Sequence, residues 1–192
     1  MMLSLGTIGV GFGFVAPTIS IGVEETVPTG ERGRAKYNLQ QLLAECPTFQ
    51  DAIGAAGSVA EKIAAAKLRL YISAKEAIEE EPDGYEWPLG LIYSVGSDTA
   101  SGSGVNQFLH GGDIELQIED DIPDELTDEP ALAERNFENF YEAVMNEATL
   151  LSGQPGYFAI NNWRVIEGPT RREVTSGVWK YNIRILINWG LS

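Results

Sequence analysis

The sequence is poor in the residues from which many active sites are built. Its 192 residues include a single cysteine, Cys46, and a single histidine, His110. One cysteine excludes a disulfide within the chain, and one cysteine with one histidine leaves too few ligands for a zinc site. Cys46 lies on the apolar side of an expected helix, which favours a buried core thiol, because a nucleophile needs a nearby base. This cysteine usage fits a reducing compartment.

The motifs of common enzyme classes are also missing. The sequence has no P-loop, no dinucleotide-binding glycine motif, no nucleophile elbow, no zinc-protease helix motif and no Cys-x-x-Cys pair. The acidic stretch 113–134 lacks the spacing of a calcium-binding loop. Nothing in it marks the two carboxylates of a glycosidase. We therefore expect a protein that is not an enzyme and that needs no metal or cofactor.

Positive charge is scarce. Thirteen Lys and Arg residues stand against 28 Asp and Glu residues, which gives a formal net charge of −15. This balance argues against a surface that grips nucleic acid, because phosphate binding needs clustered cations. It also argues against docking on an anionic membrane. No apolar run reaches the ~20 residues of a membrane span, and the N-terminus lacks the positive start of a signal peptide.

Two segments contain many glycines. Near the N-terminus, glycines alternate with the apolar residues Ile8, Val10, Phe12 and Phe14, which predicts an extended arm. Residues 24–34 are polar and turn-rich, so we interpret residues 1–35 as an extension of the main domain. The Gly/Ser-rich segment 96–112 predicts a long loop, and such loops are often functional.

Hydrophobic periodicity predicts the regular elements of residues 36–192. Helices are expected over residues 38–46, 47–56, 58–67 and 130–152. Strands are expected over residues 67–73, 85–95, 113–120, 156–168 and 177–190. The strands are well separated and show clean in/out alternation. They predict an α+β domain in which two or three helices pack on one face of an antiparallel-rich sheet.

The last predicted strand, GVWKYNIRILINWG, has two different faces. One face carries Trp179, Tyr181, Ile183, Ile185, Ile187 and Trp189, and the other carries Val178, Lys180, Asn182, Arg184, Leu186 and Asn188. The first face should pack under the helix that carries Phe137, Tyr141 and Val144. For the second face, we expect reversal of the Lys180 and Arg184 charges to leave the monomer folded but to impair its assembly into a ring.

The few cations cluster near the C-terminal end, whereas the middle of the chain is acidic. We expect a basic edge with Arg171, Arg172, Lys180 and Arg184 to meet Glu115, Glu119, Asp120 or Asp121 of a neighbouring copy. The arm with Ile8, Val10, Phe12 and Phe14 could add to a neighbouring sheet edge. For each of these residues, packing within one chain or plain exposure to solvent is the alternative.

The order of these segments and their residue patterns resemble those of a known family. The runs LQQLLAECPTFQDAIGA, KLRLYIS, GGDIELQIE, FENFYEAVMNEATLLSG and WRVIEGPTRREVTSGVWKYNIRILINWG together look like the tail terminator (tail completion) proteins of long-tailed bacteriophages, the lambda-type family. The resemblance covers residues 36–191 and rests on no catalytic signature. Residues 1–35 and the long loop 96–112 depart from the compact family fold.

The resemblance implies a structural protein of the virion. Such a subunit would assemble in the host cytoplasm into a ring, expected to be a hexamer, at the head-proximal end of the tail. The ring would end polymerisation of the tail tube protein and contact the head connector or stopper protein. DNA would pass nearby without specific binding, and no membrane would be involved. The alternatives are another head–tail junction or tail tube subunit, or an unrelated acidic binding module or secreted domain.

Overall fold

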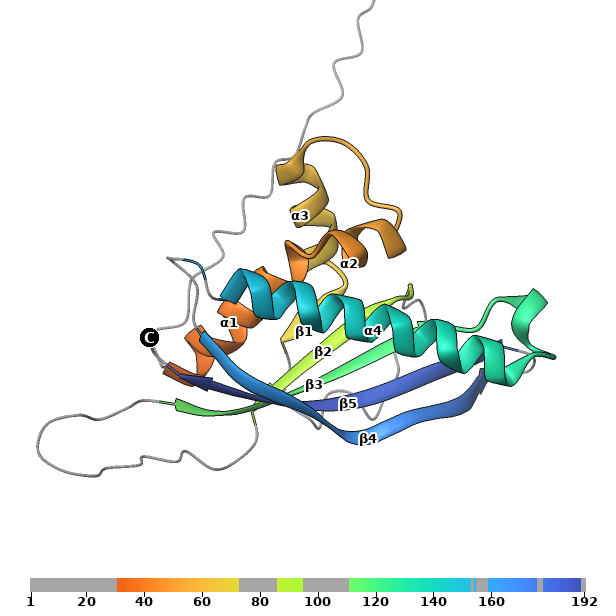
Figure 1. Cartoon of the computed structure of the whole chain (residues 1–192). Helices are drawn as coiled ribbons and strands as arrows, with labels where there is room; N and C mark the ends of the chain where they lie inside the picture. The colour runs from red at the N-terminus through yellow and green to blue at the C-terminus, as the bar shows by residue number, and fades with distance from the viewer. Residues whose placement is uncertain are drawn as a thin grey trace, which may run out of the picture.

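The fold is a five-stranded sheet with helices on one side (Figure 1). The computed structural model describes residues 31–72, 86–94, 111–152, 154, 159–175 and 178–190. The helices are α1 (Glu31–Ala44), α2 (Pro47–Ala52), α3 (Val59–Lys67) and α4 (Pro130–Ser152), with a short 3-10 turn, η2 (Asp124–Leu126), before α4. The predicted α+β class, with an antiparallel-rich sheet and helices on one face, is confirmed.

The sheet places the last strand of the sequence in its interior. The strands are β1 (Leu70–Ile72), β2 (Leu89–Ser94), β3 (Gly111–Asp121), β4 (Ala159–Thr175) and β5 (Val178–Gly190). Their spatial order is β1-β2-β3-β5-β4. Only the β1–β2 pair is parallel, and the other three pairs are antiparallel. Helix α4 therefore connects β3 to β4, and β5 then inserts between them.

The main core lies between the helices and one face of the sheet. Ile114, Leu116 and Ile118 of β3 are buried there beside Ile183, Ile185 and Ile187 of β5. The ring of Phe137 on α4 stacks on Tyr181 of β5, with the ring centroids 5.6 Å apart. The predicted packing of the apolar β5 face under α4 is thus confirmed.

Helix α4 follows its sequence signals closely. Pro130 opens the helix, where its missing N–H leaves no hydrogen bond unmade. Every fourth or third residue on one side is buried, and these residues are Ala133, Phe137, Tyr141, Val144, Met145 and Ala148. Phe140 and Leu151 are partly buried against the same core. The helix runs along the sheet (Figure 1).

The first helix begins earlier than predicted. Helix α1 begins at Glu31 rather than at Asn38, so residues 31–35 are helical and do not belong to a linker. Gly33 costs roughly 1 kcal/mol in a helix, and burial of Ala35, Leu39 and Leu42 against the core favours the helix over a linker. The predicted arm with Ile8, Val10, Phe12 and Phe14 lies outside the described residues, as does most of the predicted loop 96–112.

Strand boundaries also differ from the prediction, most of all in β1 and β4. Helix α3 ends at Lys67 as expected, but Leu68 and Arg69 donate their N–H groups back to its last turn, so β1 begins only at Leu70 and the Leu68 side chain is exposed. Strand β4 extends past Gly168 and Pro169 to Thr175. Register shifts on either side of Glu167 accommodate these two residues, because an edge strand tolerates a proline and a bulge.

Helix α3 begins with a capping box, which provides a first prediction. The Ser58 side chain accepts the N–H of Glu61, and the Glu61 carboxylate accepts the N–H of Ser58. Replacing Ser58 with alanine should lower the free energy of unfolding by about 1 kcal/mol. Urea denaturation would measure this, and Ser58→Gly should cost only a few tenths of a kcal/mol. An unchanged free energy of unfolding in Ser58→Ala would contradict a role for the hydroxyl group.

Candidate interaction surface

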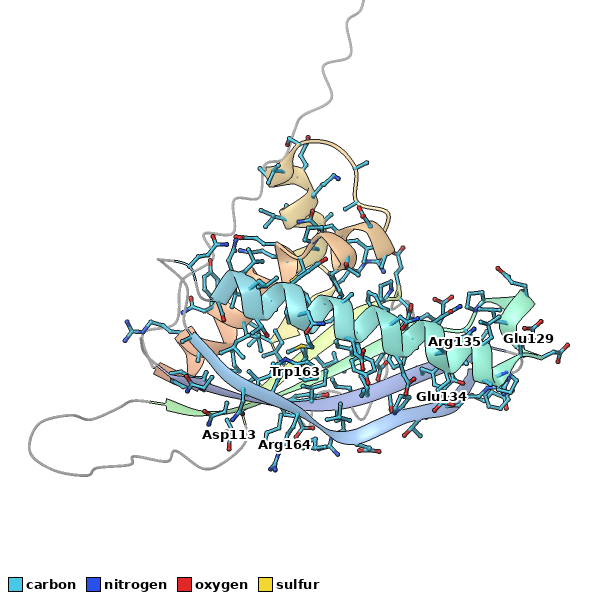
Figure 2. All side chains as sticks on the ribbon, viewed as in Figure 1. Asp113, Glu129, Glu134, Arg135, Trp163 and Arg164 are labelled. Atoms are coloured by element: carbon cyan, nitrogen blue, oxygen red, sulfur yellow. The ribbon has the colours of Figure 1, made fainter. Side chains whose placement is uncertain are left out.

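The face of the sheet opposite the helices carries an unusual mixture of apolar and charged side chains. We call it the helix-free face. On β2 it presents Leu89, Leu91 and Tyr93, which form a small buried cluster with Tyr71 and Trp87 at its margin. The register places these β2 residues opposite Glu119, Gln117 and Glu115 of β3. Asp113 and Arg164 also lie on the side of the sheet away from α4 (Figure 2).

A buried ion pair lies on this face, close to the end of β3 and the start of β5. The Lys180 ammonium group donates to the Glu119 carboxylate at 2.7 Å, and their side chains are 1% and 7% exposed. Glu119 also accepts a hydrogen bond from the Gln117 amide, and Tyr93 donates its hydroxyl to Gln117 at 3.2 Å. Burial of a charged pair is favourable only when its remaining polar atoms are satisfied. The hydrogen bonds from Gln117 to Glu119 and from Tyr93 to Gln117 satisfy some of these polar atoms.

A second charged cluster lies further along the same strands. Arg184 of β5 forms ion pairs with Glu115 of β3 and with Glu167 of β4, the latter at 2.9 Å. The hydrogen bond to Glu115 raises the pKa of the Arg184 guanidinium above its usual range. Arg184 therefore bridges three neighbouring strands.

The structure pairs the predicted charged residues within one chain. Lys180 and Arg184 contact Glu119 and Glu115 of the same sheet, so the intramolecular alternative describes these four residues. The cause is the strand order, which places β5 directly beside β3. The alternative of plain exposure to solvent is wrong for Glu115 and Glu119, because both are buried.

The remaining predicted residues lie apart from this cluster. Arg171 lies over the Trp179 ring at 4.3 Å and donates to the Thr127 carbonyl at 3.0 Å, on the helix side of the sheet. Arg172 is exposed beside Lys180 in register and has contacts of its own. Asp121 is exposed, and Asp120 is partly buried at the end of β3. The four cations and four carboxylates therefore do not form one surface.

Sequence reasoning missed three members of this network. Tyr93, Gln117 and Glu167 were placed on strands but not recognised as partners of the charged residues. The Tyr93–Gln117 contact joins β2 to β3, and the Arg184–Glu167 contact joins β5 to β4. The Gln117–Glu119 contact lies within β3. The alternation of Gln117 and Glu119 on one face was the available signal, whereas the partner of Glu167 requires the register of β4 on β5.

The outer edge of β4 is the second candidate surface. Within the described residues, this 17-residue strand pairs on one side only, with β5. Val165 and Ile166 are 38% and 43% exposed. An edge strand of this length exposes backbone donors and acceptors to which another chain can pair.

Cys46 is part of the core, as predicted. It is fully buried, and its thiol donates to the Leu42 carbonyl. Burial raises the pKa of the thiol well above its usual range, and the nearby Glu147 and Glu45 charges raise it further. A thiol so strongly held in its protonated form is a poor nucleophile.

Comparison with known proteins adds no family. No protein-family model matches the sequence, and no curated protein matches it. Across the described ranges, no group of three or more His, Cys, Asp or Glu side chains is arranged to hold a metal ion. Among the described helices, none is both long enough and apolar enough to cross a membrane.

Proposed function

We propose that the protein is a structural subunit of a ring at the head-proximal end of a long-tailed phage tail, where tail terminator proteins act. The sequence resemblance supports this proposal, and the order of elements agrees with it. Three helices, three strands, a long helix and two further strands follow one another along residues 31–190. In the ring, the subunit would contact the tail tube protein and the head connector.

The observation that carries the proposal is the open edge of β4. A long edge strand with exposed Val165 and Ile166 is an aggregation risk in an isolated subunit. Proteins that assemble head to tail can cover such an edge with the next copy, and a closing rotation gives a ring. The edge therefore suits a subunit whose final state is an assembly.

The charge of the chain suits a DNA channel. At −15 per chain, a hexamer would carry 6 × −15 = −90 before counterions. Such a surface repels phosphate groups, so DNA would pass without binding. Phosphate contacts would need clustered cations, whereas Lys180 and Arg184 are engaged by carboxylates of their own chain.

Particle size and shape test this proposal. Mass photometry and negative-stain microscopy of the purified protein, alone and with tail tubes, should show closed rings, free or at one tube end. Ile166→Lys should prevent ring formation without changing the thermal unfolding temperature, because a charge on an open edge blocks strand pairing. The matched control is Val59→Lys on α3, where the side chain is 74% exposed.

Two other outcomes would decide against a terminator. Filaments formed by the protein alone would indicate a tail tube subunit, because tube subunits polymerise by themselves. A strict monomer at micromolar concentration that also fails to bind tail tubes would overturn the proposal.

A further inference from the structure

A cleft of about 350 Å³ opens at the end of the sheet where β3 leads into η2 and α4 begins. We call it the Asp120 cleft. Its polar lining includes Asp120, Asp121 and Asn136, and its aromatic lining consists of Trp87, Phe137 and Tyr181. Figure 1 shows this end of the molecule, with the start of α4 beyond the β3 end of the sheet. The cleft is separate from the Lys180–Glu119 pair, which lies on the helix-free face.

Asp120 has no cationic partner among the residues that the structure describes. It is partly buried. Burial, together with the adjacent Asp121 charge, raises the pKa of Asp120 to about 7. Ionised carboxylates in enclosed sites are normally paired, so Asp120 differs from Glu115 and Glu119.

The other lining groups add aromatic surface and an unused donor. The Phe137 and Tyr181 rings are stacked, and the Tyr181 hydroxyl donates to the Pro130 carbonyl. Within the described part of the chain, the buried Trp87 indole N–H has no hydrogen-bond acceptor. Aromatic rings beside a carboxylate favour a cation with an apolar stem, because the rings attract the charge and contact the stem.

We propose that the Asp120 cleft binds an ammonium or guanidinium group carried on an apolar stem. Asp120 supplies the opposite charge, and Trp87, Phe137 and Tyr181 contact the stem. The volume lies within the range of small-ligand sites. A free amine or guanidine has this chemistry, and so does a lysine or arginine side chain of another copy of the chain. The proposal does not depend on ring formation.

Binding should strengthen with pH, because Asp120 must be ionised to attract the cation. Below its pKa of about 7 the carboxyl group is largely neutral, and above that value it is charged. The titratable groups nearest to Asp120 include Asp121, which adjoins it on β3, Tyr181, which lines the cleft from β5, and Lys180, which lies opposite Asp121 in register and is paired with Glu119. The charge of Glu134 raises the pKa of Tyr181, whereas the charge of Arg171 lowers it. Glu134 lies on the first half of α4 (Figure 2).

Titration with butylguanidinium tests the proposal on the full chain. The indole N–H signals are followed by NMR, and that of Trp87 is identified with Trp87→Phe. We expect a saturable shift of the Trp87 signal at pH 8 and at least severalfold weaker binding at pH 6. Neutral butylurea should cause no saturable shift. Asp120→Asn should weaken butylguanidinium binding at least tenfold at pH 8, whereas Asp124→Asn on η2 should bind like the wild type.

Sedimentation of the wild type and Asp120→Asn distinguishes the two sources of the cation. Self-association that is lost in Asp120→Asn and reversed by butylguanidinium would assign the cation to a second copy. Equal sedimentation together with saturable probe binding would assign it to a free amine or guanidine. Absence of saturable, pH-dependent binding by the wild type, with equal sedimentation of both chains, would overturn the proposal.

Discussion

Replacing Lys180 with methionine should lower the free energy of unfolding by about 3–5 kcal/mol, because it leaves the Glu119 carboxylate buried without its cation. Lys180 is only 1% exposed, and its ammonium group lies 2.7 Å from Glu119. Solvent therefore cannot easily replace the lost partner. Urea denaturation at pH 7, with the slope of the transition checked for constancy, measures the loss.

A second substitution separates the charge from the packing. Lys180→Met combined with Glu119→Gln should recover a large part of the lost stability, because both side chains are then neutral and the new amide can still bond to Gln117. Arg164→Met is the matched control: it removes an exposed cation from β4 and should cost less than about 0.5 kcal/mol. If Lys180→Met cost no more than this control, the pair would be energetically unimportant.

Replacing Ile185 with aspartate should abolish folding and soluble expression. Ile185 is fully buried in the middle of β5, between Leu116 of β3 and Val165 of β4 in register. An unpaired carboxylate there would lose its hydration without gaining a partner. Soluble yield and thermal melting measure the effect, and wild-type values for both would refute the packing of β5 beneath α4.

Alanine substitutions at Ile185 and Val165 measure how much burial at each position contributes to the free energy of unfolding. Ile185→Ala should cost about 2–5 kcal/mol, because it removes buried methyl and methylene groups and leaves a cavity. Val165→Ala, at the neighbouring register position on β4, should cost clearly less because Val165 is 38% exposed. Similar losses at the two positions would show that the β4 edge is covered in solution.

The sequence predicted those elements whose signals are local. The alternation along β5 and the helical stripe of α4 both identified the core-facing side chains, because burial of one face imposes its own period. The proline at Pro47 marked the start of α2, whereas the capping box of Ser58 and Glu61 at the start of α3 was not predicted. The start of α1 escaped prediction because tertiary packing of Leu39 and Leu42 outweighs the weak helix signal around Gly33.

The candidate surface was predictable only in part. Lys180, Arg184, Glu115 and Glu119 were singled out correctly as charged side chains on strand faces, but their partners depend on the order of strands in the sheet. Alternation cannot tell that β5 lies beside β3. The burial of Lys180 also changes an expected result: reversal of its charge would place two carboxylates together in the interior and should unfold the monomer.

The sheet order has a consequence for how the chain is made. Because β5 is inserted between β3 and β4, the strand that is synthesised last among the five is needed to join the other four into one sheet. A product that stops before Val178 would leave β3 and β4 without their shared neighbour and the apolar side of α4 partly uncovered. Cooperative folding must therefore wait until residues 178–190 are available, and shortened translation products should aggregate rather than fold.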